Sequence, residues 1–274
     1  MIVVLATTED ELPGARARLR ELGVSSADVV APSDARRLLL APVNDQSEGA
    51  ALVARLRAEG QLAVVRPGSG PALAAWTRHT RPIAIGARLS LCFAWSEHDR
   101  RSLANVVEFD PDGGFGSGQH PSTRLLLEEL AARLAGGERV LDVGCGSGVL
   151  GLCALRLGAS SAVGVDIEAT AIEATRRNAA LNGFERRMDA RLDPLGAIKG
   201  TFDVVVANIG WATLVELAQE LIERVSPSGW LAVSGISPAH CPLVAASLRP
   251  LQVLECRTSD EWSALVLARR PSDD

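Results

Sequence analysis

Hydrophobic and polar residues follow a regular order along the first 66 positions, and this order predicts six short elements. Apolar runs typical of strands occur at Ile2 to Ala6, Ala27 to Ala31, Arg37 to Ala41 and Leu62 to Val65. Helical periodicity occurs around Leu12 to Leu22 and at Gly49 to Ala58. The resulting order, βαββαβ, is that of a ferredoxin-like module. We therefore expect residues 1–66 to form a small α+β domain for substrate recognition, since such a module carries no chemistry of its own.

Residues 67–110 have the mixed character of a linker. They open with Pro67-Gly68-Ser69-Gly70-Pro71, which marks a domain boundary. Apolar stretches follow at Pro82 to Gly86, Leu89 to Trp95 and Asn105 to Phe109. We expect these short strands to pair with one another ahead of a larger domain.

From residue 111 to residue 274, strands and helices alternate in a way that predicts a parallel sheet. Strands are expected at Arg139 to Val143, Ala162 to Ile167, Phe202 to Ala207 and Trp230 to Ser234, and near Val253 and Leu265. Helices are expected at Ser122 to Leu134, Val149 to Leu157, Ala169 to Leu181, Thr213 to Val225 and Leu243 to Leu248. No helix separates the last two strands, so the sheet should end in an antiparallel hairpin. The whole chain is thus expected to be α/β, with a Rossmann-like domain preceded by the small module.

Composition narrows the class of protein. The chain has 274 residues, 47% of them hydrophobic, and no apolar run approaches the roughly 18 residues of a membrane span. The start at Met1 lacks a basic flank and reads as a strand of a cytoplasmic protein. Five scattered cysteines without a Cys-x-x-Cys pair indicate neither a disulfide framework nor a metal site. A net charge of -5 without a Lys/Arg block disfavours direct nucleic-acid binding and suits a basic protein or a small molecule.

The segment Asp142-Val143-Gly144-Cys145-Gly146-Ser147-Gly148 joins a predicted strand to a predicted helix. Missing side chains at Gly144, Gly146 and Gly148 let a ligand lie against the backbone, which suits an adenosine-bearing cofactor better than a plain turn. The same stretch matches a dinucleotide fingerprint, so a nicotinamide-dependent oxidoreductase is an alternative. Asp142 favours S-adenosylmethionine, because a carboxylate there would repel a pyrophosphate and tolerate a sulfonium.

Two polar residues end later strands at the edge where doubly wound sheets bind ligands. Asp166 can accept hydrogen bonds from both ribose hydroxyls, or it can cap the next helix close to Glu168. Asn208 can accept a hydrogen bond from an incoming amine and so act in catalysis, or it can cap the helix that carries Leu214.

The loop Phe115-Gly116-Ser117-Gly118-Gln119-His120-Pro121-Ser122-Thr123 is rich in glycine and specific in its polar residues, which suggests a loop over the cofactor. The alternative is a purely structural role, in which Ser122 or Thr123 caps the next helix and His120 is an exposed loop residue. Trp211 can line a substrate entrance or simply pack. Nothing marks Cys145 as a nucleophile.

Together these motifs resemble the PrmA-type lysine methyltransferases of a large-subunit ribosomal protein, which belong to the class I S-adenosylmethionine-dependent enzymes. The resemblance spans Pro82 to Ser234. It is carried by Asp110-Pro111, the loop ending His120-Pro121-Ser122-Thr123, the glycine turn, Asp166 and Asn208-Ile209.

The resemblance implies a seven-stranded catalytic domain preceded by a small recognition domain. It places Thr123, Gly144, Asp166 and Asn208 in the cofactor site, and it implies a cytoplasmic enzyme that methylates amino groups of a ribosomal protein. Gln119 and the segment Asn208-Ile209-Gly210-Trp211 depart from the family's usual residues, which leaves another protein or a small-molecule amine as alternative acceptors. The sequence does not indicate the oligomeric state.

Overall fold

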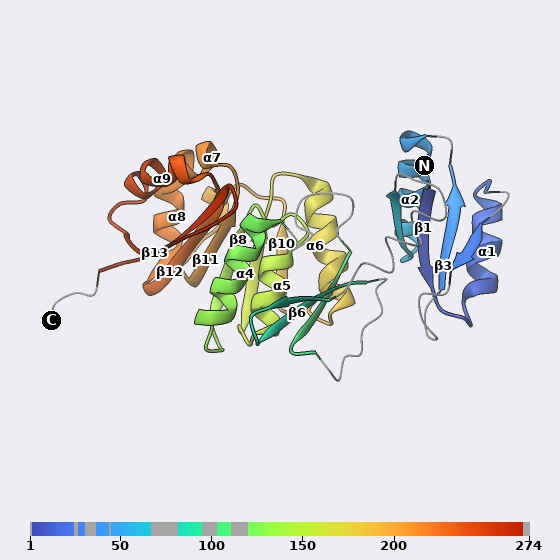
Figure 1. Cartoon of the computed structure of the whole chain (residues 1–274), viewed down its shortest axis with the longest axis horizontal. Coiled ribbons are helices and arrows are strands. Elements are labelled where there is room, and N and C mark those ends of the chain that lie inside the picture. The colour runs from blue at the N-terminus through green and yellow to red at the C-terminus, as the bar shows by residue number, and fades with distance from the viewer. Residues whose placement is uncertain are drawn as a thin grey trace. The chain divides into compact units, whose positions relative to one another are not determined.

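The computed structural model describes residues 2–24, 27–30, 37–43, 45–66, 82–94, 103–110 and 120–270. The chain divides into two compact units (Figure 1). The boundary segment Pro67 to Pro71 and the loop residues Phe115 to Gln119 lie outside the described residues. Within the described ranges, no helix combines the length and apolarity needed to cross a membrane.

The smaller unit has the βαββαβ order that the sequence predicts. Its elements are β1 (Ile2–Thr7), α1 (Leu12–Glu21), β2 (Asp28–Val30), β3 (Arg37–Pro42), α2 (Gln46–Ala58) and β4 (Leu62–Arg66). The strands lie in the order β2-β3-β1-β4 and every pair is antiparallel. Leu19 of α1 and Leu56 of α2 pack onto Leu5 and Leu39 to form its core. The side chain of Asp45 starts α2 by accepting a hydrogen bond from the backbone N–H of Glu48 at 2.9 Å.

The three short strands expected between the modules do pair with one another. They are β5 (Ile83–Ile85), β6 (Leu89–Phe93) and β7 (Val106–Phe109), in the order β5-β6-β7. Arg88 ties the β5–β6 turn to the end of α4 by donating to the carbonyl oxygens of Ala131 and Leu134. This small sheet therefore holds β7 in a defined place beside the larger fold.

A seven-stranded sheet forms the larger unit, as the resemblance implies. Its strands are β8 (Arg139–Val143), β9 (Ser161–Val165), β10 (Met188–Arg191), β11 (Phe202–Asn208), β12 (Val225–Ile236), β13 (Gln252–Ser259) and β14 (Trp262–Ala268). They lie in the order β10-β9-β8-β11-β12-β14-β13. Strand β14 runs antiparallel to both of its neighbours, β12 and β13, which confirms the expected terminal hairpin. The sequence order reverses between β8 and β11, so the ligand-binding crevice of such a sheet is expected there.

Two groups of helices cover the sheet. One group is α4 (Pro121–Arg133), α5 (Val149–Arg156) and α6 (Ala169–Leu181), and the other is α7 (Trp211–Glu216), α8 (Ala218–Arg224) and α9 (Cys241–Ser247). Both groups contact β11 and β12, and β11 is buried almost throughout. Because a strand covered on both faces reads as a continuous apolar run, Val204-Val205-Val206-Ala207 has the composition that this position requires.

The structure corrects the predicted elements in three places. Strand β10 was missed because it has only four residues, in which buried Met188 and Ala190 alternate with exposed Asp189 and Arg191. The single helix expected from Thr213 to Val225 is two helices that meet at Leu217. Val225 already belongs to β12, which is longer than expected.

Candidate functional site

The loops after three neighbouring strands meet around Ile209, at the carboxyl edge of the sheet. A Cβ on Gly144, in the turn after β8, would lie 2.4 Å from the side chain of Ile209. A Cβ on Gly235, near the end of β12, would lie 2.5 Å from the carbonyl oxygen of Ile209. Both glycines have positive φ, +70° and +86°, so glycine is required for conformation as well as for space. The glycine turn, the end of β11 and the end of β12 are therefore packed into one compact edge.

The glycine turn is fastened to the end of β9. The backbone N–H groups of Gly144 and Cys145 both donate to the carbonyl oxygen of Val165, at 2.9 and 3.1 Å. Gly146 and Gly148 also have positive φ, +55° and +78°, and Gly148 directly precedes α5. The glycine turn thus leads directly into the first free N–H groups of α5, an arrangement that can bind polar ligands at a helix N-terminus.

Asp166 follows β9 and faces the same turn. Its Oδ2 accepts a hydrogen bond from the N–H of Gly146 at 3.0 Å, and its Oδ1 accepts one from the N–H of Glu168 at 3.0 Å. Helix α6 begins after Glu168 and has no side-chain cap, so the alternative of Asp166 as a helix cap is wrong. Each carboxylate oxygen keeps acceptor capacity for a further donor.

Asp142 lies at the end of β8 and is almost fully buried. Its Oδ2 accepts a hydrogen bond from the N–H of Gly151 in α5 at 3.0 Å. Within the described part of the chain, its Oδ1 has no hydrogen-bond partner. Burial, reinforced by the nearby charge of Asp166, raises the pKa of Asp142 to about 7. An unsatisfied buried acceptor of this kind is unusual and indicates a place where a ligand or water can supply a donor.

Side chains on one face of α6 support the glycine turn from behind, and sequence reasoning missed them. Thr175 donates to the carbonyl oxygen of Gly146 at 3.0 Å. Asn178 donates to the carbonyl oxygens of Ser147 and Asp110, at 2.9 and 3.2 Å, and accepts from the N–H of Asp110 at 2.8 Å. One buried amide therefore joins the glycine turn to the end of β7. The available signal was a polar stripe at helical spacing within a helix that otherwise reads as amphipathic.

Asn208 and Thr123 are brought together although 85 positions separate them. The amide Nδ2 of Asn208 donates to Oγ1 of Thr123 at 2.8 Å. Thr123 lies in α4 and is 1% exposed, whereas Asn208 is half-buried at the end of β11. Helix α7 starts after Gly210 without a side-chain cap, so Asn208 does not cap it. The amide carbonyl Oδ1 is left as the acceptor at the edge of the site.

His120 corrects two expectations for the loop before α4. It occupies the N-cap of α4, where Nδ1 lies 2.7 Å from Oγ of Ser122, so neither Ser122 nor Thr123 is the cap. Its ring also packs edge-to-face on Trp262, with centroids 4.9 Å apart, and it is not an exposed loop residue. Trp262 begins β14, whose antiparallel direction places it beside the end of β12. No local pattern around His120 or Trp262 indicates this contact.

Trp211 and Cys145 were both left open by the sequence. Trp211 opens α7 and stacks on His240 with ring centroids 4.4 Å apart and planes within 8°. It remains 38% exposed. Cys145 is buried with its Sγ 3.4 Å from Oγ1 of Thr175, and burial raises the pKa of its thiol well above the usual value. A protonated buried thiol is a packing group, which agrees with the prediction that Cys145 is no nucleophile.

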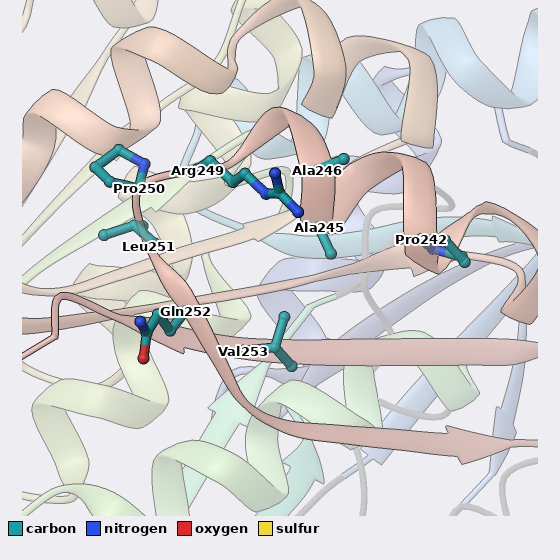
Figure 2. A pocket seen from close by; sticks show the side chains of 8 residues that line it. All are labelled: Pro242, Ala245, Ala246, Arg249, Pro250, Leu251, Gln252 and Val253. Atoms are coloured by element: carbon teal, nitrogen blue, oxygen red, sulfur yellow. The ribbon is translucent and has the colours of Figure 1, made fainter.

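A separate pocket of about 710 Å³ lies between α9 and the start of β13 (Figure 2). Its lining residues are Pro242, Ala245, Ala246, Arg249, Pro250, Leu251, Gln252 and Val253. None of them belongs to the carboxyl-edge cluster described above. The pocket therefore does not change the assignment of the candidate site.

Comparison with known proteins gives a consistent result. The model of the family described as ribosomal protein L11 methyltransferase (PrmA) matches residues 73–270. A ribosomal protein L11 methyltransferase of Pelobacter propionicus is 40% identical over 201 residues, covering 71% of this chain and 65% of the relative. One from Thiobacillus denitrificans is 44% identical over 202 residues, covering 71% and 66%. The chain thus spans slightly less than two thirds of the length of these curated relatives.

A solved structure agrees with these matches. The ribosomal protein L11 methylase of Lactobacillus delbrueckii superimposes with a TM-score of 0.63 at 27% identity, covering 69% of this chain and 97% of that one. The matched region includes the glycine turn, Asp166 and Asn208. The chain belongs to the ribosomal protein L11 methyltransferase (PrmA) family.

Proposed function

We propose that this protein transfers a methyl group from S-adenosylmethionine to an amino group of a large-subunit ribosomal protein, as the names of its relatives indicate for them. The observation that carries the proposal is the hydrogen bond from Asn208 to Thr123. It fixes a half-buried amide at the edge where Asp166 and the glycine turn that we assign to the cofactor, Gly144 to Gly148, also lie.

The residues present suit S-adenosylmethionine. The glycine turn after β8 leads into the N-terminus of α5, and the oriented carboxylate of Asp166 can accept hydrogen bonds from ribose hydroxyls. Oδ1 of Asp142 is a buried acceptor that still needs a donor. Gly144, Gly146, Gly148, Asp142, Asp166 and Thr123 would hold the cofactor. When bound, it supplies a methyl group on a positively charged sulfur, which is a good leaving group.

Asn208 orients the acceptor in this proposal. Because its Nδ2 is committed to Thr123, its Oδ1 is held as a hydrogen-bond acceptor and cannot rotate away without breaking that bond. A neutral amine that donates to Oδ1 has its lone pair directed elsewhere, toward the methyl group. Such a displacement depends on orientation and desolvation and requires no strong general base. The proton released by the amine passes to water.

The remaining assignments follow from this substrate. The small βαββαβ unit is proposed to recognise the ribosomal protein, since no cluster of the kind described at the carboxyl edge occurs among the described residues of this unit. A ribosomal-protein substrate places the reaction in the cytoplasm. We propose that the chain binds the surface of a basic protein, which suits its acidic net charge of -5.

Methyl transfer can be measured with the purified chain, S-adenosylmethionine labelled in the methyl group, and purified ribosomal protein L11, followed by mass spectrometry of the acceptor. We expect label on amino groups of ribosomal protein L11. The same labelling in whole-cell extract separates this acceptor from another protein or a small amine. Label that enters only another acceptor would overturn the proposed substrate, and the absence of any transfer would overturn the proposed reaction.

The role of Asn208 has its own test. Asn208→Ala should lower kcat while the dissociation constant of S-adenosylhomocysteine stays close to that of the wild type, because the amide acts on the amine. Unchanged turnover would contradict the assignment.

A further inference from the structure

Trp211 and His240 form an aromatic surface beside the candidate site. The proposed methyl transfer does not involve these two side chains. Their rings are parallel, with planes within 8° and centroids 4.4 Å apart. The imidazole is held in this orientation, since Nδ1 of His240 lies 2.8 Å from Oγ of Ser237. The indole has one face against His240 and is 38% exposed. A large aromatic side chain this exposed offers a fixed apolar plane to a partner.

The fold brings this pair to the carboxyl edge from two neighbouring strands. Trp211 comes three residues after Asn208, at the end of β11, and His240 follows β12 at the end of the short 3-10 helix Pro238–His240. The close approach of Gly235 to the backbone of Ile209 locks the two loops together. The aromatic pair therefore lies on loops of the same sheet edge as Asn208.

An exposed leucine extends the apolar surface. Leu243 lies three positions after His240 and is 49% exposed. His240 is the N-cap of α9 and Leu243 lies in the first turn of that helix, which packs against α7. We refer to Trp211, His240 and Leu243 as the aromatic platform.

The charge of the three segments that carry the platform favours a protein with amine-bearing side chains. The segments Trp211–Glu216, Pro238–His240 and Cys241–Ser247 contain no Lys or Arg, and the first of them contains Glu216. A nucleic-acid backbone requires basic residues at its contact surface. A lysine side chain instead presents an aliphatic stem and a cation, both of which bind favourably against the face of an indole.

We propose that the aromatic platform binds the polypeptide segment that flanks the methylated amine of the protein substrate. A lysine side chain of this flanking segment lies against Trp211. This inference rests on the proposed function, because it assigns the acceptor side of the same site. Trp211 and His240 then determine specificity for a protein acceptor, and Asn208 orients the reacting nitrogen.

The test is a calorimetric titration of the S-adenosylhomocysteine-saturated protein with ribosomal protein L11. Trp211→Ala should raise the dissociation constant for ribosomal protein L11 by roughly 3- to 30-fold. His240→Ala should raise it less, because the indole remains. Trp211→Phe should keep most of the affinity. Leu254→Ala is the matched control, since Leu254 is 58% exposed on β13 outside the platform and its removal should have no effect.

The affinity for S-adenosylhomocysteine, measured on the same variants, distinguishes recognition from a merely structural role. It should be unchanged in all of them. The proposal is overturned if Trp211→Ala binds ribosomal protein L11 as the wild type does, if it loses cofactor affinity to the same extent, or if the wild type does not bind ribosomal protein L11. It is also overturned if the substitution abolishes binding of a ribosomal RNA fragment or self-association in sedimentation, while binding of ribosomal protein L11 persists.

Methyl transfer separates this outcome from the proposed function. Equal KM for ribosomal protein L11 in wild type and Trp211→Ala refutes the platform and leaves the reaction standing. Binding of ribosomal protein L11 that depends on Trp211 without any methyl transfer supports the platform and refutes the reaction.

Discussion

The pairing of Thr123 with Asn208 can be measured as a coupling energy. Thr123→Val keeps the shape of the side chain and removes only the hydroxyl that accepts from Asn208 Nδ2 at 2.8 Å. Because Thr123 is 1% exposed, water cannot easily replace that acceptor. A typical hydrogen bond contributes about 1 kcal/mol net. If this free energy holds the amide of Asn208 in its reactive orientation, removing the hydroxyl lowers kcat by roughly fivefold.

A double-mutant cycle separates this effect from direct cofactor contacts. We expect Asn208→Ala to lower kcat more than Thr123→Val, and the double variant to be no worse than Asn208→Ala, with a coupling of about 1 kcal/mol. The assay is the rate of labelled methyl transfer at saturating cofactor, with the dissociation constant of S-adenosylhomocysteine measured in parallel. Thr123→Ser retains the hydroxyl and serves as the control. Strictly additive effects of the two substitutions would refute the reasoning.

Three further substitutions test the framework of the site. Gly144→Ala adds a Cβ 2.4 Å from the side chain of Ile209 at φ +70°, so urea denaturation should show that the free energy of unfolding falls by roughly 1–3 kcal/mol. Combining it with Ile209→Ala should recover part of this loss. An unchanged urea midpoint would contradict close packing of this edge. Asn178→Leu leaves unsatisfied the buried backbone groups of Ser147 and Asp110, so thermal unfolding should show that the free energy of unfolding falls by roughly 3 kcal/mol or more. The variant should also bind S-adenosylhomocysteine more weakly. Wild-type affinity would show that the hydrogen bonds of Asn178 do not shape the glycine turn. Burial raises the pKa of Asp142 from 3.8 to about 7, so its protonation stabilises the fold below about pH 4 and this contribution is lost as pH rises through 7. Asp142→Asn should therefore gain stability relative to wild type between pH 4 and 7, by up to roughly 4 kcal/mol, in ligand-free denaturation series, and parallel pH profiles would contradict the raised pKa.

Local sequence signals were sufficient wherever an element is long or strongly patterned. The boundaries of α6 were predicted from Ala169 to Leu181, as found, because thirteen residues give a clear helical period. Strand β11 was recognised from its valine run, which only a strand buried on both faces needs. The four-residue edge strand β10 was missed, since so short an alternation of Met188, Asp189, Ala190 and Arg191 cannot be distinguished from a loop.

The glycine turn, Asp166 and Asn208 could be placed at one edge from sequence because the ends of parallel strands meet there whatever the side chains are. Their partners could not. The bonds from Asn208 to Thr123 and from Asn178 to Asp110 join positions 85 and 68 residues apart. Which polar groups meet depends on how helices pack across the sheet, and a chain position records nothing of that packing.

The sequence by itself therefore determined the order of the longer strands and helices, the glycine-lined turn and the family. Tertiary structure alone decided that His120 packs on Trp262, that Trp211 stacks on His240, and that α6 is hydrogen-bonded to the glycine turn. The physical reason is that local propensity and hydrophobic period act over a few residues, whereas these contacts arise only after the loops of different strands are forced together around Ile209.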